Sequence, residues 1–136
     1  HSIDIKGRLI IPSKLRDDLG ENFIVTRGLD GCLFLYPKAQ WNIIINKYQL
    51  LPDTKDKRQF LRIFLSGATT CEYDKQGRIN IPKPLVDYAS LQKDCIIIGS
   101  LEKLEIWSKE KWEEFILANE ENMSEIADNL FSNLNV

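Results

Sequence analysis

The hydrophobic residues of this chain fall in short runs that recur along the sequence and are separated by Gly, Pro and charged residues. Apolar positions alternate with other residues at Leu9 and Ile11, and again at Ile79 and Ile81. This period of two residues predicts a β-strand with one buried face. Two further apolar runs follow each of these segments. The pattern therefore predicts strands over residues 9–11, 23–26, 33–36, 79–81, 95–98 and 104–107.

Helices are predicted where apolar residues recur every three or four positions or where a capping residue opens such a pattern. They are expected over residues 14–19, 37–50 and 83–89, and after each of the capping residues Thr54 and Ser108. The polar stretch 119–122 is expected to divide the last helix into two pieces.

The two halves of the chain carry the same motif, Asp-x-x-Gly-Arg followed by aliphatic positions and Pro. Residues 4–12 read DIKGRLIIP, and residues 74–82 read DKQGRINIP. Two further blocks keep the same order, pairing 23–26 with 95–98 and 33–41 with 104–112. Three collinear blocks predict an internal duplication.

The duplication divides the chain into parts. We expect a first repeat over 1–40, connecting helices over 41–68, a second repeat over 69–112, and an acidic helical tail over 113–136. Strands interspersed with helices predict an α+β, β-rich fold. A length of 136 residues suits one compact domain or two very small units that share a core.

Charge is distributed unevenly between the body and the tail. The formal net charge is −2 overall, but it is +4 over residues 1–109 and −6 over residues 110–136. A mildly basic body with an acidic tail is compatible with nucleic-acid binding, and equally with surface charge that merely partitions unevenly. Cys32, Cys71 and Cys95 lie in or beside apolar runs without C-x-x-C spacing, which predicts buried free thiols in a reducing cytoplasm. No apolar run approaches the roughly 18 residues of a membrane span.

The Asp-x-x-Gly-Arg segment is the candidate site. Gly permits a positive φ and Asp can bond the amides of a turn, so these two residue types are expected to build the loop. The loop-structuring residues are Asp4, Gly7, Asp74 and Gly77.

The Arg of each motif lies at the tip of its loop, beside a Lys. A planar guanidinium suits phosphate oxygens and the O6/N7 edge of guanine. The alternative is that the Asp–Arg pair only clamps the turn and the Arg is sequestered. If the Arg is free, the expected DNA-binding residues are Arg8, Lys6, Arg78, Lys75, Lys14 and Arg16.

The sequence does not predict an enzyme. The only His is His1, there is no H-E-x-x-H motif, and the isolated Gly residues do not form a phosphate-binding fingerprint. The Gly-Arg context of Asp4 and Asp74 favours turn clamps over acid–base chemistry. We expect no catalytic residue, cofactor, metal or small-molecule substrate. A protein-interaction module is the better rival, because Trp41, Trp107, Trp112 and Phe115 suit an interface as well as a core.

The paired motifs, together with residues 26–33 (TRGLDGCL) and 105–107 (EIW), resemble the MraZ family of the AbrB/SpoVT superfamily. The resemblance covers nearly the whole chain and weakens over the acidic tail. It implies two tandem AbrB-like swapped-hairpin units that form a pseudo-twofold small barrel. It further implies a ring-shaped homo-oligomer in the cytoplasm and nucleoid that binds direct repeats in double-stranded promoter DNA. Such proteins usually repress the bacterial division and cell-wall gene cluster.

The resemblance places the family's DNA-contacting loop on Asp4 and Arg8 and again on Asp74 and Arg78. The second copy has Gln76 where the first has Lys6, so the first loop is expected to be the stronger. The family's short strand ahead of the first motif is mostly absent, so pairing at that edge is expected to be incomplete. An AbrB-like antitoxin is a related interpretation. Antitoxins of this type usually hold one repeat, so the duplication argues against it.

Overall fold

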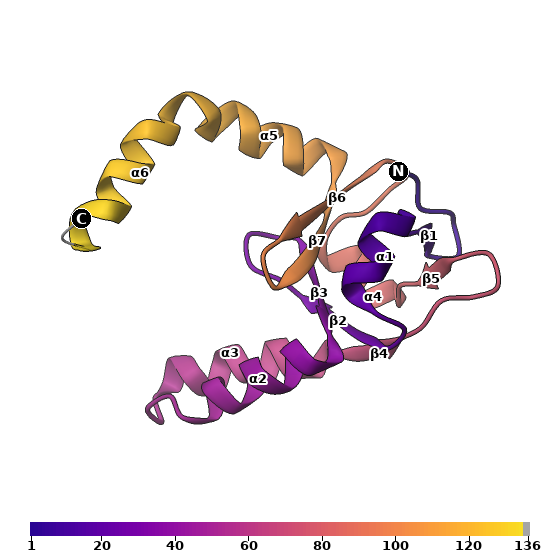
Figure 1. Cartoon of the computed structure of the whole chain (residues 1–136), viewed down its shortest axis with the longest axis horizontal. Helices are drawn as coiled ribbons and strands as arrows, with labels where there is room; N and C mark the ends of the chain where they lie inside the picture. Colours follow the sequence, from indigo (N-terminus) through magenta and orange to yellow (C-terminus); the bar gives the residue numbers. More distant parts are fainter. Residues whose placement is uncertain (135–136) are drawn as a thin grey trace.

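The computed structural model describes residues 1–134. The chain forms two antiparallel sheets with helices around them (Figure 1). The smaller sheet is a two-stranded ribbon of β1 and β5, and the larger has the strand order β4-β2-β3-β7-β6. The strands are β1 (Arg8–Ile10), β2 (Phe23–Arg27), β3 (Leu33–Pro37), β4 (Thr69–Cys71), β5 (Arg78–Asn80), β6 (Cys95–Ser100) and β7 (Lys103–Ser108). The helices are α1 (Ser13–Leu19), α2 (Lys38–Gln49), α3 (Lys55–Ser66), α4 (Lys83–Tyr88), α5 (Lys109–Asn119) and α6 (Met123–Phe131), with 3₁₀ turns at Glu120–Asn122 and Ser132–Leu134.

Each sheet combines strands from both halves of the chain. In the ribbon, Leu9 lies opposite Ile79, and in the larger sheet β3 pairs with β7 through Leu33 and Ile106. These four side chains are at most 1% exposed and belong to one core cluster. Half a chain of this length is a marginal folding unit, and here the two halves bury their apolar faces against each other in one cluster.

The two edges of the larger sheet are paired differently. On one side β4 runs along β2, with Phe23 opposite Cys71. On the other side Ser2 bridges Asp94, and the amide of Cys95 donates to the carbonyl of His1 at 2.8 Å. Within residues 1–134, the pairing of β6 on this side is confined to its first residue.

One face of the larger sheet packs in the core cluster shared with the ribbon, and the opposite face is covered by helices. Along β3 the side chains alternate, with Leu33 and Leu35 in the core cluster and Phe34 and Tyr36 on the opposite face. Phe64 of α3 packs on Tyr36, with ring centroids 6.4 Å apart. Because both faces are buried, β3 reads as a continuous apolar run rather than an alternating one.

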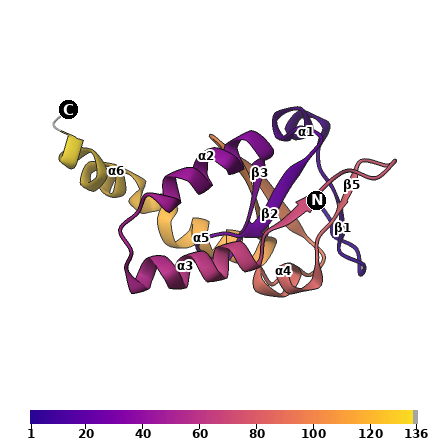
Figure 2. The same cartoon turned by 90° about the horizontal axis from the view of Figure 1, so that it is seen from below.

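Helices α2 and α3 form an antiparallel hairpin that extends away from the sheets (Figure 2). Its base is fixed by the buried hydroxyl of Thr26, which donates to the carbonyl of Phe64 at 2.6 Å. Farther out, Tyr48 packs edge-on against Phe60 at 5.6 Å between ring centroids. Thr54 caps α3 by accepting a hydrogen bond from the amide of Lys57, as the sequence predicts.

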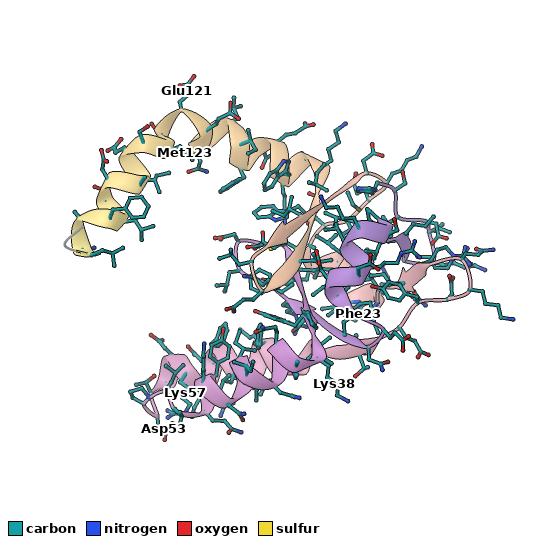
Figure 3. All side chains as sticks on the ribbon, viewed as in Figure 1. Phe23, Lys38, Asp53, Lys57, Glu121 and Met123 are labelled. Atoms are coloured by element: carbon teal, nitrogen blue, oxygen red, sulfur yellow. The ribbon has the colours of Figure 1, made fainter. Side chains whose placement is uncertain are left out.

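The C-terminal helices form an arm, defined here as residues 109–134, that curves away from the sheets (Figure 1). Trp112 packs on Trp107 of β7 at 5.4 Å, and this contact holds the start of α5. Glu121 and Met123 mark the bend between α5 and α6, on the side away from the hairpin tip at Asp53 and Lys57 (Figure 3). Beyond the first turn of α5, most of the large apolar side chains of the arm are exposed: Phe115, Leu117, Met123, Ile126, Leu130, Phe131 and Leu134.

The sequence predictions for the elements are confirmed with small shifts of their ends. The helical caps at Thr54 and Ser108 and the break after Asn119 are confirmed as well. The α+β class is confirmed, and the three cysteines are buried and free. Strand β4 is missing from the prediction, because Thr69–Cys71 is too short to show an alternating pattern.

Candidate nucleic-acid interface

The first Asp-x-x-Gly-Arg loop is built by its Asp. One carboxylate oxygen of Asp4 accepts from the amides of Lys6 and Arg8, each at 2.9 Å, and the other accepts from Nε of Arg8 at 2.6 Å. The amide of Gly7 donates to the carbonyl of Asp4 at 3.0 Å, with Gly7 at φ +81°. These bonds of Asp4 and Gly7 hold the chain in a tight turn.

The second loop repeats this arrangement almost bond for bond. Asp74 accepts from the amides of Gln76 and Arg78 at 2.8 and 2.9 Å and from Nε of Arg78 at 2.7 Å. Gly77 has φ +76°. In both loops the pKa of the Asp is lowered, first by the hydrogen bond from the Arg amide and further by the guanidinium. Both carboxylates are therefore held in the charged form at neutral pH.

The Arg of each loop is held on one side only. Arg8 and Arg78 donate through Nε, and their side chains are 34% and 27% exposed. Within residues 1–134, neither terminal Nη group of either guanidinium has a hydrogen-bond partner. The pair thus clamps the turn and also orients the guanidinium, so the two alternatives drawn from the sequence are not exclusive.

The ribbon sets the relation between the loops. Each loop precedes its strand, and β1 and β5 are antiparallel, so the loops extend from opposite ends of the ribbon. Both loops project at the end of the molecule opposite the C-terminal arm (Figure 2). Because Leu9 and Ile79 face the core, Arg8, Ile10, Arg78 and Asn80 share the outer face.

The two loops differ in what packs behind their glycines. At Gly7, the carbonyl oxygen of Ile81 lies 2.5 Å from where an added Cβ would stand. At Gly77 that place is taken by Nη1 of Arg16, which comes from α1 of the other half. The offset of 70 residues aligns Arg16 with Val86. The sequence placed Arg16 among the basic candidates but gave no reason to assign it to the second loop, because that contact joins residues 61 positions apart.

The remaining predicted cations lie in the two loops and on α1. Lys6 and Lys75 are exposed within their loops, and Lys14 is exposed in the first turn of α1. The second loop therefore has Arg16 at its glycine where the first loop has Lys6 within its own sequence.

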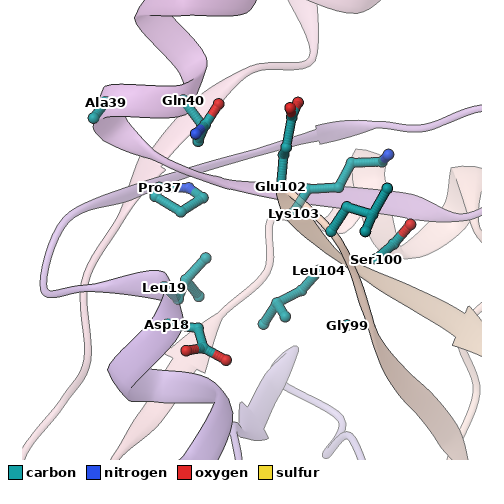
Figure 4. A pocket seen from close by; sticks show the side chains of 11 residues that line it. Asp18, Leu19, Pro37, Ala39, Gln40, Gly99, Ser100, Glu102, Lys103 and Leu104 are labelled. Atoms are coloured by element: carbon teal, nitrogen blue, oxygen red, sulfur yellow. The ribbon is translucent and has the colours of Figure 1, made fainter.

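A cavity of about 580 Å³ lies between α1 and the turn from β6 to β7 (Figure 4). Asp18 lines this cavity, and the repeat alignment pairs Asp18 with Tyr88 of the second half. There the larger Tyr88 side chain reaches the loop from β2 to β3 and donates to the carbonyl of Gly28 at 2.6 Å. The cavity thus follows from a size difference between the repeats.

Within residues 1–134, no three His, Cys, Asp or Glu side chains gather in a way that would hold a metal ion. None of the helices formed by these residues combines the length and the apolar character needed to cross a bilayer.

Comparison with known proteins gives a consistent result. The family model described as "MraZ protein, putative antitoxin-like" matches twice, over residues 1–63 and 64–134. A protein of Ligilactobacillus salivarius named "Transcriptional regulator MraZ" is 56% identical over 131 residues, covering 96% of this chain and 92% of that protein. A protein of the same name from Pediococcus pentosaceus is 53% identical over 131 residues, with the same coverage. With two family matches, one for each Asp-x-x-Gly-Arg loop, and relatives at this identity over nearly its full length, the chain belongs to the MraZ family.

Proposed function

We propose that this chain is a non-enzymatic transcriptional regulator that binds double-stranded DNA through its two Asp-x-x-Gly-Arg loops. One observation carries the proposal: two guanidinium groups, each oriented by an Asp through Nε, present unbonded Nη edges at the two ends of one exposed ribbon. The names of the relatives support a regulatory role.

The chemistry of these groups suits a DNA duplex. An Arg whose Nη edge is free can donate to O6 and N7 of guanine, or to phosphate oxygens. The major groove accepts a two-stranded β-ribbon. In this arrangement Arg8 and Arg78 lie on the groove side, while Lys6, Lys75, Lys14 and Arg16 contact the phosphates and supply most of the affinity.

Binding is tested with Arg8→Ala and Arg78→Ala against a duplex selected from a randomised library by the wild-type chain. Each substitution is expected to lower affinity roughly 5- to 150-fold, the range for loss of one bidentate base contact. Because Arg16 compensates for Gln76, we expect losses of similar size at the two loops. Affinity of the wild type should also fall steeply with salt.

The matched control is Arg58→Ala. Arg58 is also paired with an Asp, Asp53, at 3.0 Å, but it lies in the hairpin. Binding to a duplex that holds a single site should be unchanged. Normal DNA binding by both Arg8→Ala and Arg78→Ala would show that the loops are not the contact surface.

The ring-shaped oligomer is the second part of the proposal, and the arm and the hairpin supply its interface. The arm exposes an apolar face formed by Ile126, Leu130 and other residues, and residues 110–134 carry one Lys against seven Asp and Glu. The hairpin exposes Ile43 and Ile63, and residues 38–66 carry six Lys and Arg against two Asp.

Opposite charge and unpartnered apolar side chains suit docking of the arm of one copy on the hairpin of the next. Such a contact is heterologous, so repeating it builds a ring when the rotation closes. A ring repeats the loops and raises the effective concentration of each loop pair for repeated DNA sites.

The ring is tested by light scattering on Ile126→Asp, with Leu101→Asp as the control. Leu101 is fully exposed at the turn from β6 to β7 and belongs to neither the arm nor the hairpin. We expect Ile126→Asp to shift the molar mass to smaller species and the control to leave it unchanged. An unchanged mass for Ile126→Asp would exclude the arm as the interface.

The cellular role follows from the family resemblance. We propose a cytoplasmic, nucleoid-associated regulator that represses the division and cell-wall gene cluster by binding direct repeats in its promoter. The tandem AbrB-like swapped-hairpin barrel is proposed as the frame that holds both loops. Chromatin mapping of bound sites tests this, since binding spread evenly over the chromosome would contradict a cluster-specific regulator.

A further inference from the structure

The outer face of the ribbon carries two side chains that the proposed loop contacts leave unused. Ile10 is 56% exposed on β1, and Asn80 is exposed on β5. The register places Asn80 directly opposite Arg8, and Ile10 directly opposite Arg78. Each guanidinium therefore has one neighbour across the ribbon, and the two neighbours differ in chemistry.

Neither side chain has a structural role that explains its exposure. Ile10 points away from the core that Leu9 enters, and its apolar surface meets solvent. The amide group of Asn80 makes no hydrogen bond within residues 1–134, and its Oδ1 leans over the first loop, 3.3 Å from where a Cβ of Gly7 would stand.

The two positions are equivalent under the duplication, because Ile10 and Asn80 are separated by the repeat offset of 70 residues. A ribbon with identical residues at both positions would present a face of twofold symmetry and would favour a base sequence with the same symmetry. This chain instead places an aliphatic side chain at one end and a carboxamide at the other.

We infer that Ile10 and Asn80 are specificity-determining residues that orient the chain on a DNA site without twofold symmetry. The inference rests on the proposed function, since it requires the ribbon to face the major groove. Asn can donate to N7 and accept from N6 of adenine in a bidentate contact, whereas an apolar side chain fits the methyl group of thymine. Each residue lies beside an Arg suited to guanine, so each end of the ribbon reads two adjacent bases of different kind.

Direct repeats give this asymmetry a use. Sites repeated in one direction are matched by subunits that all bind in one orientation. A chain whose ribbon ends are chemically distinct can hold that orientation on every repeat, whereas a symmetric ribbon could bind each repeat in either direction.

The test compares base preferences rather than total affinity. The full-length wild type, Asn80→Ile and Ile10→Asn each select duplexes from a randomised library, and affinities are then measured for every single-base change in the wild-type site. We expect Asn80→Ile to lose roughly 5- to 150-fold discrimination at one base pair and to select a more symmetric site. The salt dependence of binding should not change, because no phosphate contact is removed.

Two further variants sharpen the result. Leu101→Asn makes the same kind of change at a fully exposed position with φ +55°, which Asn tolerates, and should leave all preferences unchanged. The exchange variant Ile10→Asn with Asn80→Ile should regain the wild-type preference on a single-site duplex, bound in the opposite orientation.

The outcomes separate this inference from the proposed function. If the wild type enriches a sequence but Asn80→Ile and Ile10→Asn show the same preference at every base pair, the inference is overturned and the loop contacts stand. If the wild type enriches no sequence, the proposed function fails and this inference with it. Both side chains are exposed, so an unchanged thermal midpoint in each variant verifies that the fold is retained.

Discussion

Replacing Gly7 by Ala tests whether the close contact behind the first loop is a structural requirement. Gly7 has φ +81°, and an added Cβ would stand 2.5 Å from the carbonyl oxygen of Ile81, closer than Cβ atoms approach other atoms. The amide of Ile81 also donates to the carbonyl of Gly7 at 2.8 Å. The substitution must therefore push the loop away from β5 and stretch this hydrogen bond.

The magnitude can be separated into conformational and steric parts. The left-handed backbone conformation destabilises an Ala relative to Gly, whereas the lower entropy of the unfolded chain with Ala favours folding. The net cost of these two effects is about 1 kcal/mol. Overpacking against backbone adds about 1–3 kcal/mol. Gly7→Ala should therefore destabilise the fold by about 2–4 kcal/mol, which lowers the midpoint of thermal unfolding by on the order of 10 °C.

Two other glycines provide matched controls. Gly31 has φ +79°, but an added Cβ would meet only the flexible end of Lys111, so Gly31→Ala should cost about 1 kcal/mol. At Gly77 the obstacle is Nη1 of Arg16, which can move. Gly77→Ala should therefore be intermediate in stability but should weaken DNA binding. The assay is urea unfolding followed by circular dichroism at one protein concentration. A loss for Gly7→Ala no larger than for Gly31→Ala would refute the steric argument.

Three further predictions concern buried and titrating groups. Thr26→Val should cost about 1–3 kcal/mol in urea unfolding, because the carbonyl of Phe64 loses its buried donor, whereas exposed Thr70→Val should cost little; equal values would contradict this. The lowered pKa values of Asp4 and Asp74 stabilise the fold above the ordinary value of 3.8, and this contribution is lost as pH falls through the lowered pKa. The double variant Asp4→Asn with Asp74→Asn should therefore show a flatter loss of thermal stability in acid than the wild type, and an equally steep loss would count against these bonds. Burial raises the pKa of Cys32 to about 12 and that of Cys71 to about 11, so a disulfide reagent should modify these thiols only after unfolding; rapid reaction of the native chain would disprove their inaccessibility.

Much of the fold could be predicted because its cues are local. Strand alternation around Leu9 and Ile79, the caps Thr54 and Ser108, and the Gly turns all act within a few residues. The Asp-x-x-Gly-Arg loop is the clearest case, because the hydrogen bonds that its Asp carboxylate accepts join residues at most four positions apart. Because these bonds are local, the repeated sequence forms the same Asp–Arg turn in both halves of the chain.

Other features required contacts across the chain. Strand β4 forms only because β2 offers it an edge, and no local pattern marks its three residues. The last helix was expected to have an apolar face, but its exposure along the arm depends on the direction in which α5 leaves the sheet. The sequence also predicted weaker DNA binding by the second loop because of Gln76. It could not show that tertiary contacts bring Arg16 to Gly77.

The sequence by itself determined the two loops, their Asp and Gly framework and the identity of their Arg residues, because short-range hydrogen bonds and backbone preferences fix them. Only the tertiary structure decided how the loops lie relative to each other. The pairing of β1 with β5, between residues about 70 positions apart, sets the loops at opposite ends of one ribbon. It also places Asn80 beside Arg8 and Ile10 beside Arg78. That register follows from burying Leu9 against Ile79 in a core that residues of both halves form together.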